Sequence, residues 1–256
     1  MIAESSREWP LRVEFANTTA DIAEVQRLRH QVFVGELGAT INDCDGNRDH
    51  EYDRDRFDPH CVQLVVRANH GPVVACARIL TTETARHCGG FYSESEFDLT
   101  PILALPGRIM EVGRVCVHPD HRQGPAIALL LSGLADFLED HAYDYLIGCG
   151  SVPLSPDREQ ALRTVATLIR RYGCPDALRV APRNPLPQAQ DSDGDDGSAT
   201  PALLRAYTRL GAYIGGPACL DPDFGVADVL ILLFRTRFDR RYLERLLGRT
   251  SRQRAA

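Results

Sequence analysis

The stretch from residue 110 to residue 131 constrains the fold of this 256-residue chain more than any other part of its sequence. It begins as a β-branched, apolar run (109–117), which predicts a strand. A Pro-Asp turn and a short polar loop containing Gly124 follow, and an apolar helix is expected from about Ala126. A strand, a tight loop and a helix N-terminus together form a concave row of backbone N–H groups, which favours phosphate binding.

Charged residues stand in several apolar settings around this strand. Glu111 and Arg114 lie within the strand itself, and charges in a strand that is expected to be central need a reason. Their spacing of three places them on opposite faces of an ideal strand unless a bulge intervenes. Further charges of this kind occur upstream, at Arg29, Asp55, Asp58 and Arg78. One interpretation is a network of buried salt bridges, and the other is a polar site.

Hydrophobic periodicity predicts an α/β fold in which helices flank a mixed sheet. The expected strands are 11–16, 61–68, 73–80, 109–117, 143–149, 212–216 and 226–234. The expected helices are 18–34, 126–141, 156–172 and 201–210, and a basic helix follows the last strand. Residues 81–106 should be irregular but anchored by apolar side chains. We expect one domain over residues 10–236, with a mobile insertion at about 181–200, and a basic helix and tail over 237–256.

Composition excludes several classes of protein. The chain has no lysine, which excludes Schiff-base chemistry and a lysine-dependent phosphate loop. The eight cysteines form no CxxC and no zinc-type spacing, so we expect no disulfide and no metal. No apolar run approaches about 20 residues, and no secretion signal is visible, so a cytoplasmic protein is expected.

The C-terminal segment 235–256 is strongly basic in an otherwise acidic chain. It holds eight arginines against two acidic residues, whereas the net charge of the whole chain is −6. This segment is either a solvated tail or a docking surface for an acidic protein or an anionic membrane. Nucleic-acid binding is not expected, because the chain is acidic overall and the basic segment has few interleaved aromatic residues.

The loop around Gly124 resembles the pantetheine-pyrophosphate loop of the GNAT acyltransferase superfamily. That superfamily favours Gln or Arg, two variable residues, Gly, one variable residue, then Gly or Ala. The corresponding run here is His121-Arg122-Gln123-Gly124-Pro125-Ala126. The resemblance implies a GNAT-like fold with a mixed, mostly antiparallel sheet and a thioester donor held by Val115, Val117, His121, Arg122, Gln123, Gly124 and Ala126. Because the loop begins with His and is short, acetyl-CoA is a less favoured donor.

The dispersed charges resemble the acyl-homoserine lactone synthase branch of the same superfamily. The matching motifs are Arg29-His-Gln-Val-Phe33, Asp55-Arg-Phe-Asp58, Ala77-Arg78-Ile79 and Glu111-Val-Gly-Arg114. Ala39 replaces a tryptophan of that branch, which argues against lactone synthesis.

A closer resemblance, over about residues 10 to 245, is to the haemolysin-like ornithine N-acyltransferases. It rests on Phe91–Leu99, Gly113–Asp120, Ile127–Leu130, Tyr145–Cys149 and Ala227–Ile231. This resemblance implies transfer of a (3-hydroxy) fatty acyl group from acyl carrier protein, or from acyl-CoA, to the α-amine of ornithine. No other cofactor is implied. The product would be a lyso-ornithine lipid, which could bring the protein to the inner face of the membrane through its basic tail.

These patterns assign candidate roles for direct aminolysis of a thioester. Glu111 is the expected general base, because a buried carboxylate with a raised pKa suits removal of a proton from an ammonium. Asp55 and Asp58 could hold ammonium groups, and Arg29, Arg78 or Arg114 the substrate carboxylate. Backbone N–H groups from Val115 to Val117 could polarise the thioester carbonyl.

Other functions stay open at this stage. The chain could acylate another amino acid or amine, or make an acyl-homoserine lactone. It could also be a non-catalytic regulator that binds an acyl carrier protein or a membrane.

Overall fold

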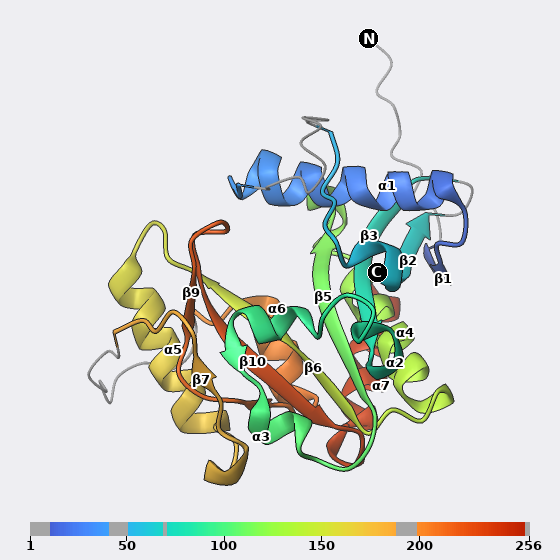
Figure 1. The fold of residues 1–256 in the computed structure, drawn as a ribbon. Coiled ribbons are helices and arrows are strands. Elements are labelled where there is room, and N and C mark those ends of the chain that lie inside the picture. The colour runs from blue at the N-terminus through green and yellow to red at the C-terminus, as the bar shows by residue number, and fades with distance from the viewer. Residues whose placement is uncertain (1–10, 41–50, 69–70, 188–198, 254–256) are drawn as a thin grey trace.

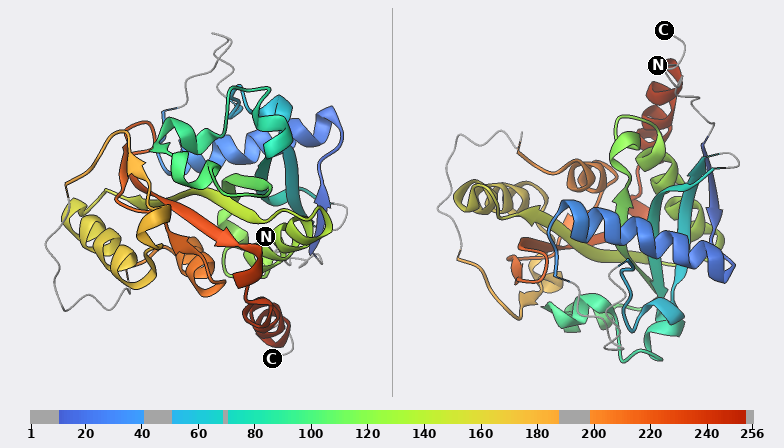
Figure 2. Two further views of the ribbon diagram at one scale, coloured as in Figure 1. Left: turned by 60° about the horizontal axis from the view of Figure 1, so that its bottom comes forward. Right: turned by 90° about the horizontal axis from the view of Figure 1, so that it is seen from above.

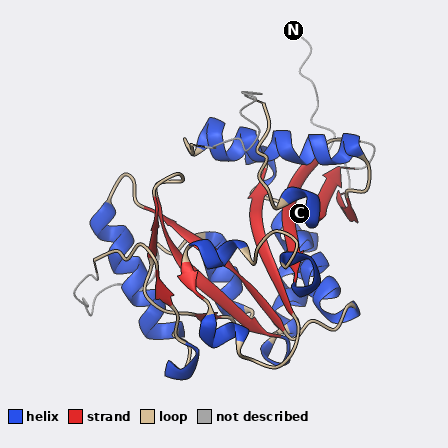
Figure 3. Cartoon of the chain, in the orientation of Figure 1, coloured by secondary structure: helices blue, strands red, loops and turns tan. Residues whose placement is uncertain are grey.

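The computed structural model describes all residues except 1–10, 41–50, 69–70, 188–198 and 254–256. One eight-stranded mixed sheet, flanked by helices, organises the described residues, as the sequence predicted (Figure 1, Figure 3). Its order is β1 (Leu11–Phe15), β2 (Val62–Ala68), β3 (Val73–Thr81), β5 (Ile109–Val117), β6 (Tyr145–Pro153), β10 (Val226–Phe234) and β8 (Tyr213–Ile214), with β9 (Cys219–Asp221) also paired to β10. Neighbouring strands are antiparallel except β5 and β6, which run parallel.

Helices cover both faces of the sheet. On one face lies α1 (Thr19–His30) (Figure 2). Its Val25 and Leu28 pack with Cys76 and Cys116 of the central strands. On the other face lie α4 (Ala126–Asp140), α5 (Arg158–Tyr172), α6 (Ala202–Arg209) and α7 (Arg240–Gln253). No helix among the described residues is both long enough and apolar enough to cross a membrane.

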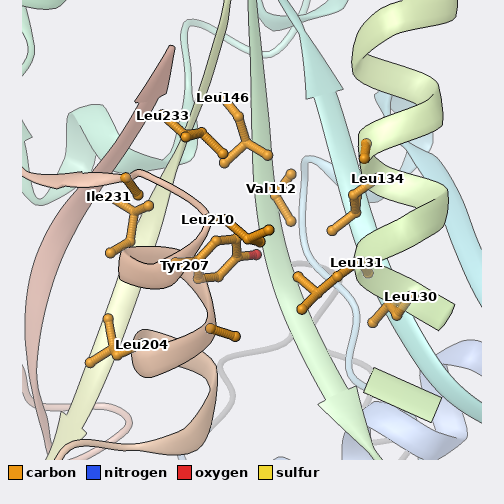
Figure 4. Close-up of a cluster of buried hydrophobic side chains, with 14 of the residues drawn as sticks. Val112, Leu130, Leu131, Leu134, Leu146, Leu204, Tyr207, Leu210, Ile231 and Leu233 are labelled. Atoms are coloured by element: carbon orange, nitrogen blue, oxygen red, sulfur yellow. The ribbon is translucent and has the colours of Figure 1, made fainter. Parts of the chain in front are cut away.

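The main core lies between the sheet and α4 and α6. Leu130, Leu131 and Leu134 of α4 are almost fully buried against the sheet (Figure 4). Tyr207 of α6 fills the space over the far half of the sheet, beside Ile231 (Figure 4). The apolar run after Gly124 is therefore a buried helix, as its composition predicts.

The first helix changes geometry near its end. Thr18 caps α1 through a reciprocal pair of hydrogen bonds with Asp21. The sequence predicted one helix to about residue 34, but residues Gln31–Glu36 form a π-helix, a wider turn that is often found at functional sites.

The region expected to be irregular contains short ordered elements. These are α2 (Thr82–Ala85), a 3-10 turn at Tyr92–Ser95, β4 (Phe97–Asp98) and α3 (Thr100–Leu103). Phe91, Phe97 and Leu99 are buried and anchor it, as predicted.

Several expected boundaries differ in the structure. The helix expected from residue 156 begins at Arg158, as α5, and the strand expected over 212–216 is shorter, as β8. The strand predicted over 143–149 begins and ends later, as β6, because it continues past Cys149 alongside β10. The insertion expected from residue 181 begins with β7 (Ala181–Pro182), which pairs with β4, so its first residues are hydrogen-bonded. Residues 188–198 lie outside the described part, and their mobility stays a prediction.

Candidate active site

A cavity opens where the two parallel strands separate. Strand β5 pairs with β6 from Ile109 to Glu111, and beyond this point the strands diverge (Figure 1). The cavity between them measures about 610 Å³ and is lined by residues 111–115 of β5 and 148–151 of β6. At the apex, the Val112 carbonyl oxygen would lie 2.3 Å from a Cβ placed on Gly148, so only glycine fits there.

A β-bulge turns the side chain of Arg114 into this site. Opposite β3, Cys116 pairs with Cys76 and Gly113 pairs with Arg78, so β5 carries one extra residue. Arg114 lies in this bulge with a φ of +50°, a left-handed conformation that is costly for a side chain other than glycine. Both Glu111 and Arg114 line the cavity, because the bulge removes the opposite-face relationship of an ideal strand.

Three arginines and three aspartates form one buried ion-pair network beside the cavity: Arg29, Arg78, Arg114, Asp53, Asp55 and Asp58. The side chain of Arg29 is fully buried and bonds Asp53 at 2.7 Å and Asp58 at 2.7 Å. Burial alone would raise the pKa of Asp58, but the charges of Arg29 and Arg78 hold it at about 2. The Asp58 carboxyl is therefore ionised at neutral pH.

Most of the charged residues that the sequence places in apolar settings pair with one another in this network. Arg78 bonds Asp55 at 2.6 Å and Asp58 at 3.0 Å, while Arg114 bonds Asp53 at 3.0 Å and Asp55 at 3.4 Å. The buried salt-bridge alternative is thus realised in the structure, and direct substrate contacts by Asp55 and Asp58 stay a prediction. The sequence reasoning missed Asp53, although an acid two residues before Asp55 is a visible signal.

Glu111 is held rigidly at the cavity wall. One carboxylate oxygen accepts the Tyr92 N–H at 2.7 Å, and the other accepts the Ser93 N–H at 2.7 Å and the Ser93 hydroxyl at 2.5 Å. Burial raises the pKa of Glu111, and these hydrogen bonds partly oppose that effect. The sequence did not show that the irregular segment supplies these donors.

Aromatic rings enclose the guanidinium of Arg114. Its central carbon lies 5.5 Å from the Tyr92 ring centroid and 5.1 Å from that of Phe224. Phe224 in turn packs edge-on against Phe33, with ring centroids 5.7 Å apart. The predicted residue Phe33 therefore lines the same cavity, together with two aromatic residues that sequence reasoning did not select.

The predicted donor loop lies at the far end of β5. Val115 lines the cavity, whereas Val117 and residues 121–126 lie outside its lining. Arg122 bonds the Val117 carbonyl at 3.1 Å and holds Glu36, at the end of the π-helix, through two short bonds of 2.5 and 2.6 Å. Helix α4 begins at Ala126, and the first-turn amides of a helix have no intrahelical acceptor. Such amides are available to a phosphate.

A second group of acidic residues, which sequence reasoning missed, has two members in the cavity lining, Asp221 and Asp228, and a third, Glu96, beside them. Carboxylate oxygens of Glu96, Asp221 and Asp228 lie within 4.8 Å of one another. Carboxylates of this kind can hold a hard cation. The sequence predicted no metal, and that expectation is not tested by this arrangement.

The splayed parallel strands, the cavity between them and the helix that follows β5 define an acyltransferase of the GNAT class. Residues 28–132 match the family model described as an acetyltransferase (GNAT) domain. The L-ornithine N(alpha)-acyltransferase of Rhodobacter capsulatus is 35% identical over 86% of this chain and 88% of its own length. That of Rhizobium meliloti is 33% identical over 91% of this chain and 83% of its own length. The chain belongs to the L-ornithine N(alpha)-acyltransferase family, and it is an acyltransferase enzyme.

Solved structures show the same fold at low sequence identity. The acyl-homoserine lactone synthase LasI matches with a TM-score of 0.51 and 15% identity, over 89% of this chain and 91% of that chain. The CoA-dependent acyl-homoserine lactone synthase BjaI matches with a TM-score of 0.53 and 15% identity, over 94% of this chain and 89% of that chain. These likenesses confirm the predicted GNAT-like architecture.

Proposed function

We propose that this protein transfers a (3-hydroxy) fatty acyl group from an acyl carrier protein thioester to the α-amine of ornithine, giving lyso-ornithine lipid. The observation that carries the proposal is the cavity between β5 and β6, which places Glu111 and Arg114 on the strand that leads into the donor loop. The names of the relatives in Rhodobacter capsulatus and Rhizobium meliloti support ornithine as the acceptor.

The chemistry needs no covalent enzyme intermediate, because a thioester is already activated. The neutral α-amine attacks the carbonyl carbon, the new C–N bond forms, and the C–S bond breaks to release the pantetheine thiol. An ammonium of pKa near about 10 must first lose a proton at neutral pH. Glu111 is suited to accept it, because burial raises the pKa of its carboxyl and the residue lines the cavity.

Attack of the amine places negative charge on the thioester carbonyl oxygen. This oxygen and the carboxylate of the amino acid both require hydrogen-bond donors in the same cavity. Pairing of β5 to β6 ends at Glu111, so the following β5 amides on that edge face the cavity rather than a strand. The N–H groups near Val115 are therefore suited to the thioester oxygen. Arg114 uses Nε and Nη2 in its ion pairs, which leaves Nη1 for the α-carboxylate of the amino acid.

The thioester arm is expected to reach the cavity from the donor loop. The amides at the start of α4 would bind the pantetheine phosphate, and the Arg122–Glu36 pair would keep the loop and the π-helix together at the entrance. No cofactor besides the acylated co-substrate is proposed.

Any contact with an anionic membrane is assigned to the arginines of α7 rather than to its apolar side. Leu243 is buried, and Tyr242, Leu246 and Leu247 pack against the core. Arg241 and Arg245 are exposed and present charge at the surface. A cytoplasmic protein held at the inner membrane by charge is consistent with this arrangement.

The function is tested by incubating the purified protein with mixed acyl carrier protein thioesters and mixed amino acids, followed by mass spectrometry of the amides. The expected product is N-acyl-ornithine. Formation of a homoserine lactone, or of another amide without any ornithine product, would contradict the proposal.

A further inference from the structure

The second acidic group carries an inference that rests on the proposed function and deepens it. We propose that Glu96, Asp221 and Asp228 form a subsite for the side-chain ammonium of the acceptor amino acid, and that this subsite selects a dibasic acceptor.

The first observation is that Glu96 and Asp228 are buried and that carboxylate oxygens of both lack hydrogen-bond partners among the described residues. Glu96 is 7% exposed, and both its side-chain oxygens lack a hydrogen-bond partner among the described residues. Asp228 is 3% exposed, and its Oδ1 also lacks one. A buried carboxylate without a donor is costly, and buried polar groups in proteins are otherwise almost always satisfied. Unpaired acceptors that converge on one point therefore call for a cationic donor.

The second observation is the distribution of charge along the cavity. The arginines that line it, Arg78 and Arg114, are both engaged in the balanced network of three arginines and three aspartates. Glu96, Asp221 and Asp228 have no arginine partner of this kind among the described residues. The carboxyl groups without an arginine partner therefore lie at the second acidic group and not at Asp55 and Asp58.

The third observation is position. Asp221 and Asp228 line the cavity that also contains Glu111. Ser93 connects the two regions, because its hydroxyl lies 2.5 Å from Glu111 and 3.4 Å from the Cys149 sulfur. Cys149 in turn lies close enough to Glu96 and Asp228 for their charges to raise the pKa of its thiol further, after burial. An amino acid whose α-amine meets Glu111 would direct its side chain along the cavity wall to the acidic group.

Local structure explains how the subsite is built. Asp228 of β10 lies opposite Ser151 on β6 and Cys219 on β9, between these two strands. One oxygen of Asp221 caps the turn to Phe224 by accepting the Asp223 and Phe224 N–H groups at 2.9 and 3.2 Å. Glu96 follows the turn that Glu111 anchors, so the residue expected to serve the α-amine also helps to position the subsite.

The decisive experiment compares L-ornithine with L-norvaline, which has the same carbon chain without the side-chain amine. Steady-state kinetics with one acyl carrier protein thioester, in the presence of EDTA, are measured for the wild type, Glu96→Gln and Asp228→Asn. Each variant should lower kcat/KM for ornithine by about 10- to 100-fold, the range for loss of one charge-assisted hydrogen bond. The value for norvaline should change by less than about twofold, because norvaline makes no contact that the variants remove.

The control is Asp176→Asn, which removes a negative charge from a side chain that is 96% exposed. It should leave the preference for ornithine unchanged. Equal losses for ornithine and norvaline in Glu96→Gln and Asp228→Asn would indicate a general structural defect and would overturn the subsite. An unchanged preference for ornithine in both variants would overturn it as well.

Direct binding separates the subsite from the proposed reaction. Calorimetry with ornithine should show weaker binding to Asp228→Asn than to the wild type and Asp176→Asn, even if the natural acyl donor is a different thioester. If the wild type acylates another amine and does not bind ornithine, both proposals fail. Tight binding of Mg²⁺ or Ca²⁺ that the same variants abolish, with ornithine binding unaffected, would assign the carboxylates to a metal instead.

Discussion

Ser93 donates two hydrogen bonds to the same carboxylate oxygen of Glu111, from its backbone N–H at 2.7 Å and from its hydroxyl at 2.5 Å. The segment that sequence patterns described only as irregular thus holds the proposed general base. The backbone bond would remain in Ser93→Ala, which removes the hydroxyl bond alone.

Glu111→Gln should lower turnover at least about 100-fold, the lower end of the usual contribution of a general base, with folding retained. The isosteric amide keeps the shape of the side chain and removes its ability to accept a proton. The measurement is kcat with ornithine, with circular dichroism as the check on folding. Near-normal turnover in a folded variant would eliminate Glu111 as the base.

Ser93→Ala should shift the acidic limb of the pH–rate profile to higher pH. The hydroxyl bond lowers the pKa of Glu111, so its loss raises that pKa further, and the deprotonated base then forms only at higher pH. The profile of kcat/KM is the measurement. An unchanged limb would mean that another group controls the reaction.

Arg29→Ala should lower the free energy of unfolding by about 3–5 kcal/mol, because it leaves Asp53 and Asp58 buried with an uncompensated charge. Urea unfolding provides the measurement. Arg245→Ala serves as the matched control: that side chain is 60% exposed and lies 3.9 Å from its partner, so the change should stay below about 1 kcal/mol. Similar values for both variants would contradict the structural role of the network.

The free protein should become less stable as pH rises from about 4.5 towards 9, through the titration of Glu96. Burial and the charge of Asp228 raise the pKa of Glu96 from 4.5 to about 9, so the folded state binds more protons than the unfolded state in this window. Stability from this group is present below the unfolded pKa and is lost as pH approaches the folded pKa. Asp228, whose pKa burial raises to about 6, and Asp221, whose pKa burial also raises, add in the same direction.

Glu96→Gln should therefore flatten this dependence, and the variant should be more stable than the wild type at pH 8. Thermal unfolding at pH 5, 6, 7 and 8 is the measurement. Saturating ornithine should reduce the loss of stability with rising pH in the wild type but not in Glu96→Gln. Parallel pH curves for the two proteins would show that Glu96 does not titrate in this window.

Gly148→Ala should destabilise the protein by about 1–3 kcal/mol and reduce activity, because the added methyl group meets the Val112 carbonyl at the apex of the cavity. Gly113→Ala is the control for stability, since an added Cβ there has no neighbour within 4 Å. Chemical unfolding of the two variants provides the comparison. Equal stability would indicate that the strands can separate further at little cost.

Replacing both Arg241 and Arg245 with glutamine should weaken binding to vesicles that contain anionic lipid, by about 1 kcal/mol per arginine. The apolar side of α7 is used in packing, so activity on a short-chain acyl donor should not change. Vesicle co-sedimentation at low and physiological salt is the measurement. Unchanged binding would remove the tail from any role at the membrane.

The sequence by itself determined the architecture and the class of chemistry. Hydrophobic periodicity defined nearly every long strand and helix, because burial of one face imposes its period on local sequence. The run from β5 through Gly124 into α4 predicted a phosphate-binding turn, because a strand, loop and helix start can be recognised locally, and its resemblance to the GNAT loop extended that prediction to a pantetheine thioester. Glu111 and Arg114 stood out because charges in a buried strand are costly.

Only the tertiary structure decided which charges pair and which stay free. Asp53 joined the arginine network, and Glu96, Asp221 and Asp228 converged from separate turns and strands. Arg114 joins the network from a bulge in β5, and Glu96 reaches the acidic group from a turn that is tied to Glu111. Contacts between residues distant in the chain leave no periodic signal, so the division between a neutral network and an unpaired acidic group could be seen only in three dimensions.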